Sequence, residues 1–207
     1  MKTRLTALAA LAFLGSCSAQ YAPVSMDEVC AFPTPASGVC LYTSTCTNTL
    51  AGTAMLDVAT AGFDFVLPIQ FTNQLTSSAN VGNGTVDANQ AYIETIQVQY
   101  GGAPAMETAT IPVTITVPTA GSTTSVVSLI PLADFAKLPV VPGGFSTVVM
   151  SLQAKGVFLS QQSFTTASFQ IPVTICSGCL GGNPCPTGQN VSGVCPQLGQ
   201  TNTVSCQ

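Results

Sequence analysis

Cysteine is the residue type in this sequence with the greatest capacity for chemistry. Cys176-Ser-Gly-Cys179 is a C-x-x-C motif, and Cys185 follows it closely. Such a pair can exchange electrons with another thiol when it opens a helix after a strand, and a set of four cysteines can hold a zinc ion. The residues after this motif, LGGNPCP, are typical of a loop, and they favour a structural disulfide over a redox pair or a zinc site.

Nine cysteines occur in all, and eight of them are candidates for disulfide bonds: Cys30, Cys40, Cys46, Cys176, Cys179, Cys185, Cys195 and Cys206. An even number of cysteines in an exported chain is typical of a disulfide framework. Three of the eight lie near the mature N-terminus and five near the C-terminus. We expect structural bridges at both ends, with the pairing left open, and no bound metal or cofactor.

The ninth cysteine ends an apolar run at the N-terminus. Lys2 and Arg4 precede the run from Leu5 to Leu14, which is too short to span a bilayer and is typical of a secretory signal. Leu-Gly-Ser-Cys17 at its end favours a bacterial lipobox, with residues 1–16 removed and lipid attached to Cys17. The alternative is cleavage after Ala19 by an ordinary signal peptidase, which yields a secreted chain without lipid. Both interpretations predict export.

The scarcity of charge and the lack of histidine exclude several classes of function. Without the signal, two lysines and no arginine stand against eight acidic residues, so the chain cannot form a phosphate-binding patch for nucleic acid. The sequence contains no histidine, which removes serine and cysteine triads and imidazole acid–base catalysis. Paired carboxylates stay formally open, as Asp57 with Asp64 or Glu94 with Glu107. No spacing distinguishes either pair from solvated surface acids, and we predict no catalytic residue.

The elements that must position these residues are strands. Apolar and polar residues alternate with period two in FDFVLPIQFTNQL (63–75), ETIQVQY (94–100), TATIPVTITVP (108–118), STTSVVSLI (122–130), STVVMSLQAKGVFL (146–159) and SFQIPVTIC (168–176). Only PLADFAKL, 131–138, has a short helical pattern. The series predicts an all-β, antiparallel, immunoglobulin-like sandwich over residues 57–176. Residues 17–56 and 177–207 are expected to form loop segments stapled by disulfides.

The pentamer IPVTI occurs twice, at 111–115 and 171–175, with a proline inside each predicted strand. Proline cannot donate a hydrogen bond to a neighbouring strand, so Pro112 and Pro172 predict sheet edges or bulges, and Pro68 in LPIQF predicts the same. Edge prolines block pairing with other chains. The repeat therefore indicates edge protection more than a duplicated ligand platform.

The chain resembles a group of exported lipoproteins of deltaproteobacteria of the myxobacterial type. The resemblance rests on LGSC, on FVLPIQFTNQL followed by an Asn/Gly turn, on QIPVTICSGCL, and on the later CP, LGQ and final Cys206. It implies a β-sandwich lipoprotein of the cell envelope and carries no activity with it. This chain differs from the group in its low number of charged residues.

We therefore expect a lipid-anchored, non-enzymatic protein of the envelope, at the periplasmic or surface face of the outer membrane. Its role would be structural, adhesive or assembly-related, with the membrane, copies of itself or an envelope protein or glycan as partner. The alternative is a secreted or anchored module that binds carbohydrate or peptide. That alternative predicts an aromatic-lined groove, for which the tyrosines are Tyr21, Tyr42, Tyr92 and Tyr100.

Overall fold

The chain is all-β. The computed structural model describes residues 22–30, 46, 53–77 and 87–180, together with the backbone of three two-residue strands beyond them. The main strands are β1 (Val24–Val29), β2 (Ala54–Asp57), β3 (Phe65–Asn73), β4 (Ala91–Gly101), β5 (Ala109–Val117), β6 (Gly121–Ile130), β7 (Ser146–Phe158), β8 (Ser163–Thr165) and β9 (Phe169–Cys176). The two-residue strands are β10 (Val191–Ser192), β11 (Gln200–Thr201) and β12 (Ser205–Cys206).

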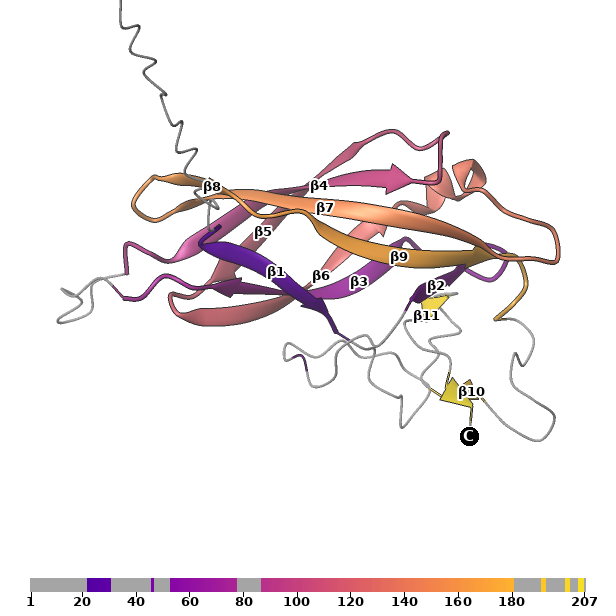
Figure 1. Ribbon diagram of the computed structural model, residues 1–207, viewed down its shortest axis with the longest axis horizontal. Helices are drawn as coiled ribbons and strands as arrows, with labels where there is room; N and C mark the ends of the chain where they lie inside the picture. Colours follow the sequence, from indigo (N-terminus) through magenta and orange to yellow (C-terminus); the bar gives the residue numbers. More distant parts are fainter. Residues whose placement is uncertain are drawn as a thin grey trace, which may run out of the picture.

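Two sheets form the body of the molecule (Figure 1). The smaller sheet has the order β1-β3-β6, and the larger one has the order β11-β2-β9-β7-β4-β5, with β8 paired to β7. Neighbours are antiparallel as expected, except that β2 runs parallel to β9, with Ala54 opposite Val173 and Asp57 opposite Cys176. That pairing corrects the expectation of a purely antiparallel structure. It arises because β2 fills the side of β9 that faces away from β7 and buries Ala54 and Leu56 completely.

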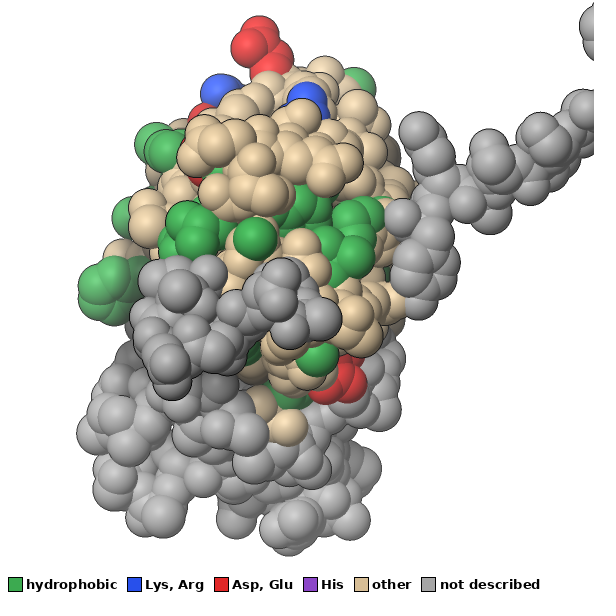
Figure 2. All heavy atoms as spheres, turned by 90° about the vertical axis from the view of Figure 1, so that its left-hand side faces the viewer, with side chains coloured by type: hydrophobic (Ala, Val, Ile, Leu, Met, Phe, Trp, Pro, Cys, Tyr) green, Lys and Arg blue, Asp and Glu red, His purple; other side chains and the backbone are tan. Residues whose placement is uncertain are grey.

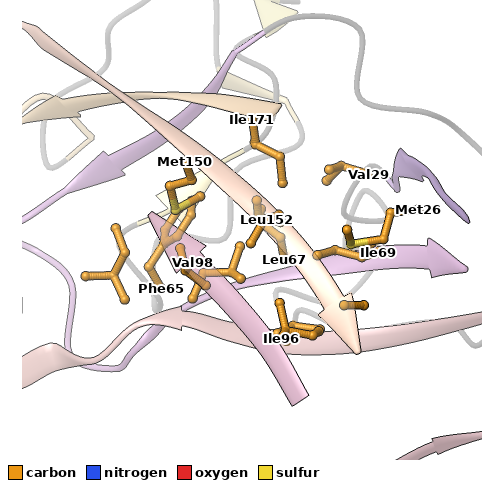
Figure 3. Packing of buried hydrophobic residues seen from close by; sticks show 14 of the residues in the cluster. Met26, Val29, Phe65, Leu67, Ile69, Ile96, Val98, Met150, Leu152 and Ile171 are labelled. Carbon is orange, nitrogen blue, oxygen red and sulfur yellow. The ribbon is translucent and has the colours of Figure 1, made fainter. Parts of the chain in front are cut away.

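The two sheets share one hydrophobic core. Figure 3 shows Phe65, Leu67 and Ile69 of the smaller sheet close to Val98, Met150 and Leu152 of the larger one. The alternation in the sequence predicted this burial, since Phe65, Leu67, Ile69 and Phe71 are all fully buried. Phe63, expected on the same face, is 60% exposed because β3 begins two residues later.

A bulge in β4 brings two backbones unusually close. The register of β4 skips between Ile93 and Thr95 against both neighbouring strands, which leaves the exposed Glu94 without a position in either ladder. Gly156 of β7 lies opposite Ile93, and a Cβ atom there would lie 2.0 Å from the carbonyl oxygen of Tyr92. Only glycine fits at this position.

The prolines do not all lie on edge strands. Pro112 lies in β5, which ends the larger sheet, so the prediction of edge protection is confirmed there. Pro172 and Pro68 lie in β9 and β3, which have neighbours on both sides, so the prediction was wrong for those two strands. The ladder between β2 and β9 begins at Val173, one residue after Pro172. Pro68 turns its carbonyl toward β1, where it accepts a hydrogen bond from the N–H of Cys30 at 2.8 Å. Pro68 and Pro172 thus each stand one residue beyond the end of a neighbouring ladder.

The sheets begin earlier in the chain than the alternating pattern suggested. β1 is an edge of the smaller sheet with Val24 fully buried, although residues 17–56 were expected to be loop-like. The short helical pattern at 131–138 forms a 3-10 helix, Leu132–Lys137, as predicted. An ion pair between Lys137 and Asp134, 2.7 Å apart, links its two turns.

Candidate functional site

The middle of the outer face of the larger sheet presents two rows of uncharged polar side chains. Gln97 of β4 lies between Thr110 of β5 and Gln153 of β7. The next row joins Gln99, Ser151 and Gln170 across β4, β7 and β9. Because side chains alternate between the two faces of a strand, these residues point away from the core formed by Ile96, Val98 and Leu152. The middle of this face thus carries amides and hydroxyls, with the exposed Lys155 two residues beyond Gln153 on β7 and the exposed Val149 two residues before Ser151.

A shallow hollow of about 160 Å³ lies in the middle of this face and is lined by Gln97, Gln99, Ser151, Gln153 and Ser168. The hydroxyls of Ser151 and Ser168 are 2.7 Å apart and hydrogen-bonded to each other, and Gln153 Nε2 donates to the carbonyl oxygen of Thr166 at 3.2 Å. These bonds hold the rim in place while the other amide groups stay available. The arrangement can bind a neutral polar surface through hydrogen bonds, and it offers no charged group for an ionic ligand.

A larger hollow, of about 550 Å³, lies beside the β7–β8 hairpin and is lined by Ala22, Pro23, Gln153, Phe158, Gln162, Ser163, Phe164, Thr165, Thr166 and Ala167. The rings of Phe158 and Phe164 have their centroids 4.8 Å apart, and both side chains are buried. Figure 2 shows the end of the molecule that carries this hairpin, where hydrophobic side chains gather in the middle and charged ones stand only toward the rim. The hollow thus has an apolar floor and a neutral polar rim.

The carboxylate of Asp57 ties the end of β2 to the turn after β9. Its Oδ1 accepts hydrogen bonds from the N–H groups of Ala59 at 3.0 Å and Gly178 at 2.7 Å, and its Oδ2 accepts one from Leu180 at 2.7 Å. Burial raises the pKa of the Asp57 carboxyl. These bonds and one from the Thr60 hydroxyl together lower the pKa by more than burial raises it, so the net pKa lies below its ordinary value. Asp57 is therefore buried and ionised, and its hydrogen bonds connect the end of β2 to the turn after β9.

Asp57, Cys176 and Cys179 together form a cluster of possible metal ligands, with ligand atoms within 4.8 Å of one another. The chemistry of the cluster favours a structural role. Both carboxylate oxygens already accept backbone hydrogen bonds, and the two sulfur atoms are joined in a disulfide. A disulfide sulfur lacks the thiolate charge by which cysteine binds metal. The three side chains instead fasten one end of the larger sheet.

Asp57 and Asp64, which sequence spacing left open as a pair, have different hydrogen-bond partners in the structure. Asp64 accepts hydrogen bonds from the Ser128 hydroxyl and the Leu132 N–H, both at 2.9 Å, and so joins the start of β3 to the end of β6. Asp57 is bonded in the larger sheet. Glu94 stands on the β4 bulge and Glu107 in the exposed loop before β5. The two aspartates each have a structural partner, which sequence reasoning missed. The one available signal was the Asp-x-Ala turn after Leu56, in which an aspartate bonds the N–H two residues on.

The predicted disulfide residues fall partly within the described structure. Cys30 is bonded to Cys46 and Cys176 to Cys179, with Cα atoms 5.2 Å and 6.0 Å apart. Cys17, Cys40, Cys185 and Cys195 lie outside the described residues, and Cys206 is described only as backbone in β12. The C-x-x-C motif ends a strand and enters a turn, where no helix follows in the described part of the chain.

The tyrosines do not gather into a groove where they are described. Tyr100 is buried, and its hydroxyl donates to the carbonyl oxygen of Leu129 at 2.6 Å across the two sheets. Tyr92 is half-buried on β4. Tyr21 and Tyr42 lie outside the described residues.

Comparison with models of known protein families found no match, and a search of curated proteins found no similar sequence. Within residues 22–180, as far as they are described, no helix is long and apolar enough to cross a membrane.

Proposed function

We propose that the chain is an exported, lipid-anchored protein of the cell envelope with a structural, adhesive or assembly role and no catalytic activity. The outer face of the larger sheet, whose middle rows are polar and uncharged, carries the proposal. Its rows of Gln, Ser and Thr side chains suit contact with another neutral surface, such as a protein or glycan of the envelope. The lipobox Leu14-Gly-Ser-Cys17 supports attachment through a lipid on Cys17.

The strand order supports an immunoglobulin-like arrangement. Without the short β2 and β8, the chain has seven main strands. The first, second and fifth of these form one sheet, β1-β3-β6, and the third, sixth and seventh form the row β4-β7-β9 of the other. Immunoglobulin domains divide their strands in this way. β5 is the fourth main strand and pairs with β4, where a constant-type domain would pair it with β6.

Three acids of the described chain support a non-catalytic role, because each is bonded to another part of the fold. Asp57 holds backbone N–H groups, Asp64 holds Ser128 and Leu132, and Asp134 pairs with Lys137. A carboxylate whose oxygens already accept hydrogen bonds from the fold is less available to contact a substrate.

The test is the intact mass of the protein purified from its own host's membranes, before and after reduction. We expect a diacylglyceryl group on Cys17 and the loss of one hydrogen for each of the remaining cysteines. A chain that begins at Gln20 without lipid would overturn the anchor. Hydrolysis of envelope glycans or peptides that disappears on substitution of one acid would overturn the non-catalytic role.

The second candidate is a module that binds carbohydrate or peptide in the hollow beside the β7–β8 hairpin. Gln153 lines both this hollow and the one on the outer face. Saturable binding on a glycan or peptide array that is lost in Gln153→Ala, and kept in Gln99→Ala, would favour this candidate. The buried rings of Phe158 and Phe164 offer no exposed face for sugar stacking, which is why we place it second.

A further inference from the structure

The open side of β6 is an unpaired strand edge. β6 ends the smaller sheet, and its ladder with β3 runs from Gly121 to Ile130 (Figure 1). Val126 lies opposite Pro68, whose carbonyl is turned toward β1. In an antiparallel ladder, the backbone N–H and C=O groups of two facing residues either bond to each other or both point away from each other. Because the Pro68 carbonyl points away from β6, the N–H and C=O of Val126 point to the open side.

Every second residue of β6 follows the same rule. Ser122 and Thr124 therefore point their backbone groups the same way as Val126, and within the described residues these groups have no partner on that side. Near the start of the strand, the Thr123 hydroxyl donates to the Thr116 carbonyl oxygen of β5 at 2.9 Å; farther along, Val126 is 40% exposed. A row of free donors and acceptors of this kind is a template for another strand.

β1, β5 and β8 also have an open side, and each carries a feature that hinders pairing with another chain. β1 has Asp27 and Glu28 and a bulge between Met26 and Glu28. β5 has Pro112, and β8 has only three residues. β6 reads GSTTSVVSLI, which has no proline, no charge and high β-propensity over ten residues. The nearest acid, Asp64, is already bonded to Ser128 and Leu132 beyond the middle of the strand.

We propose that β6 pairs with β6 of a second copy of this chain, antiparallel, so that the two smaller sheets become one. The occupant follows from the chemistry of the edge. An uncharged strand of Ser, Thr and Val meets no like charge when it faces its own copy, and a two-fold axis lets each donor of one copy meet an acceptor of the other. This inference rests on the assembly role proposed above and names its partner.

The test is native mass spectrometry of the full mature protein released from detergent, over a range of protein concentrations. The wild type is expected to form dimers. Val126→Lys is expected to raise the dimer dissociation constant about tenfold or more, because it adds a positive charge to each of the two paired strands. Val149→Lys is the matched control: Val149 is 36% exposed on the outer face of β7, an inner strand, and its variant should dimerise as the wild type does.

A second variant and a second readout protect the test against misfolding. Val126→Pro removes the outward N–H and leaves the bonds to β3 intact, and it should abolish the dimer. In hydrogen exchange, the amides of Thr124 and Val126 should slow when the dimer forms. The amide of Ser125, which faces β3, should stay unchanged.

A wild type that stays monomeric would contradict the proposal that β6 pairs with β6 of a second copy. A folded Val126→Lys variant that dimerises with unchanged affinity would contradict it too. Dimers that form through the lipid would persist in both Val126 variants, which distinguishes them from dimers that form through β6. An unlipidated chain whose dimer depends on Val126 would contradict the lipid anchor and support pairing through β6. A lipidated chain that stays monomeric would support the anchor and contradict pairing through β6.

Discussion

The carboxylate of Asp57 accepts a hydrogen bond of 2.7 Å from the backbone N–H of Gly178, a residue 121 positions later in the chain. The bond closes the parallel pair of β2 and β9 at its end, beside the disulfide between Cys176 and Cys179. Bonds between a buried carboxylate and backbone N–H groups are stronger than those between neutral groups. This contact is therefore a principal fastening of β2 to the rest of the larger sheet.

Asp57→Asn should lower the free energy of unfolding by about 3 kcal/mol, because the amide cannot accept all the backbone N–H bonds and loses the charge that strengthens them. Urea unfolding followed by circular dichroism measures the loss. Asp27→Asn, at an exposed acid bonded to Ser25, is the control and should change stability by less than about 0.5 kcal/mol. Equal losses in the two variants would contradict the role of Asp57.

The same carboxylate should make stability depend on pH. Since the pKa of Asp57 in the folded chain lies below the ordinary value of 3.8, its contribution is complete above that value and is lost as the pH falls through the folded pKa. Unfolding of the wild type at about pH 6 and about pH 2 should therefore show a loss of stability that is smaller in Asp57→Asn. A variant as sensitive to acid as the wild type would exclude Asp57 as the source.

Tyr100 should show the opposite dependence. Burial raises its pKa to about 12, with a smaller contribution from the charge of Asp134. Because the folded pKa lies above the unfolded one, the stabilisation is present at neutral pH and disappears as the pH rises from about 10 to 12. Tyr100→Phe, which loses the hydrogen bond to Leu129, should cost about 1–2 kcal/mol at neutral pH and abolish this alkaline loss. Unfolding across the alkaline range, with absorbance of tyrosinate recorded in parallel, measures both.

Gly156→Ala should destabilise the fold by more than about 4 kcal/mol or prevent folding, because the new Cβ would overlap the Tyr92 carbonyl and lie 2.9 Å from Cα of Ile93. Thermal unfolding of the purified chain gives the change. Gly62→Ala is the matched control, since nothing lies within 4 Å of its Cβ position. A tolerated alanine at 156 would show that the two backbones can separate at the bulge.

The two described disulfides should differ in their contribution to stability. Cys30 and Cys46 are 16 positions apart, and Cys176 and Cys179 are three apart. A longer closed loop restricts the unfolded chain more, so the paired Cys→Ala substitutions should cost about 3 kcal/mol for the first bridge and about 1.5 kcal/mol for the second. Chemical denaturation of the two double variants makes the comparison. A larger cost at Cys176 and Cys179 would indicate that the turn bonded to Asp57 depends on its bridge.

The strands of the core were predictable because alternation is a local property. Burial of Phe65, Leu67, Ile69 and Phe71 follows from a period of two, which any strand with one face on a core must show. The candidate site was predictable in kind: Gln97, Gln99 and Gln153 were readable as the polar face of their strands. The hollow between them was not, since it depends on which strands become neighbours.

The sequence by itself determined the all-β class, the scarcity of charge and the positions of the cysteines, and it predicted a signal at the N-terminus. Only the tertiary structure decided that β2 joins β9 in parallel, that Pro68 and Pro172 lie within inner strands, and that Asp57 is buried with backbone partners. The reason is physical. Alternation, composition and motifs act over a few residues, while strand order and the end of each ladder depend on contacts between segments far apart in the chain.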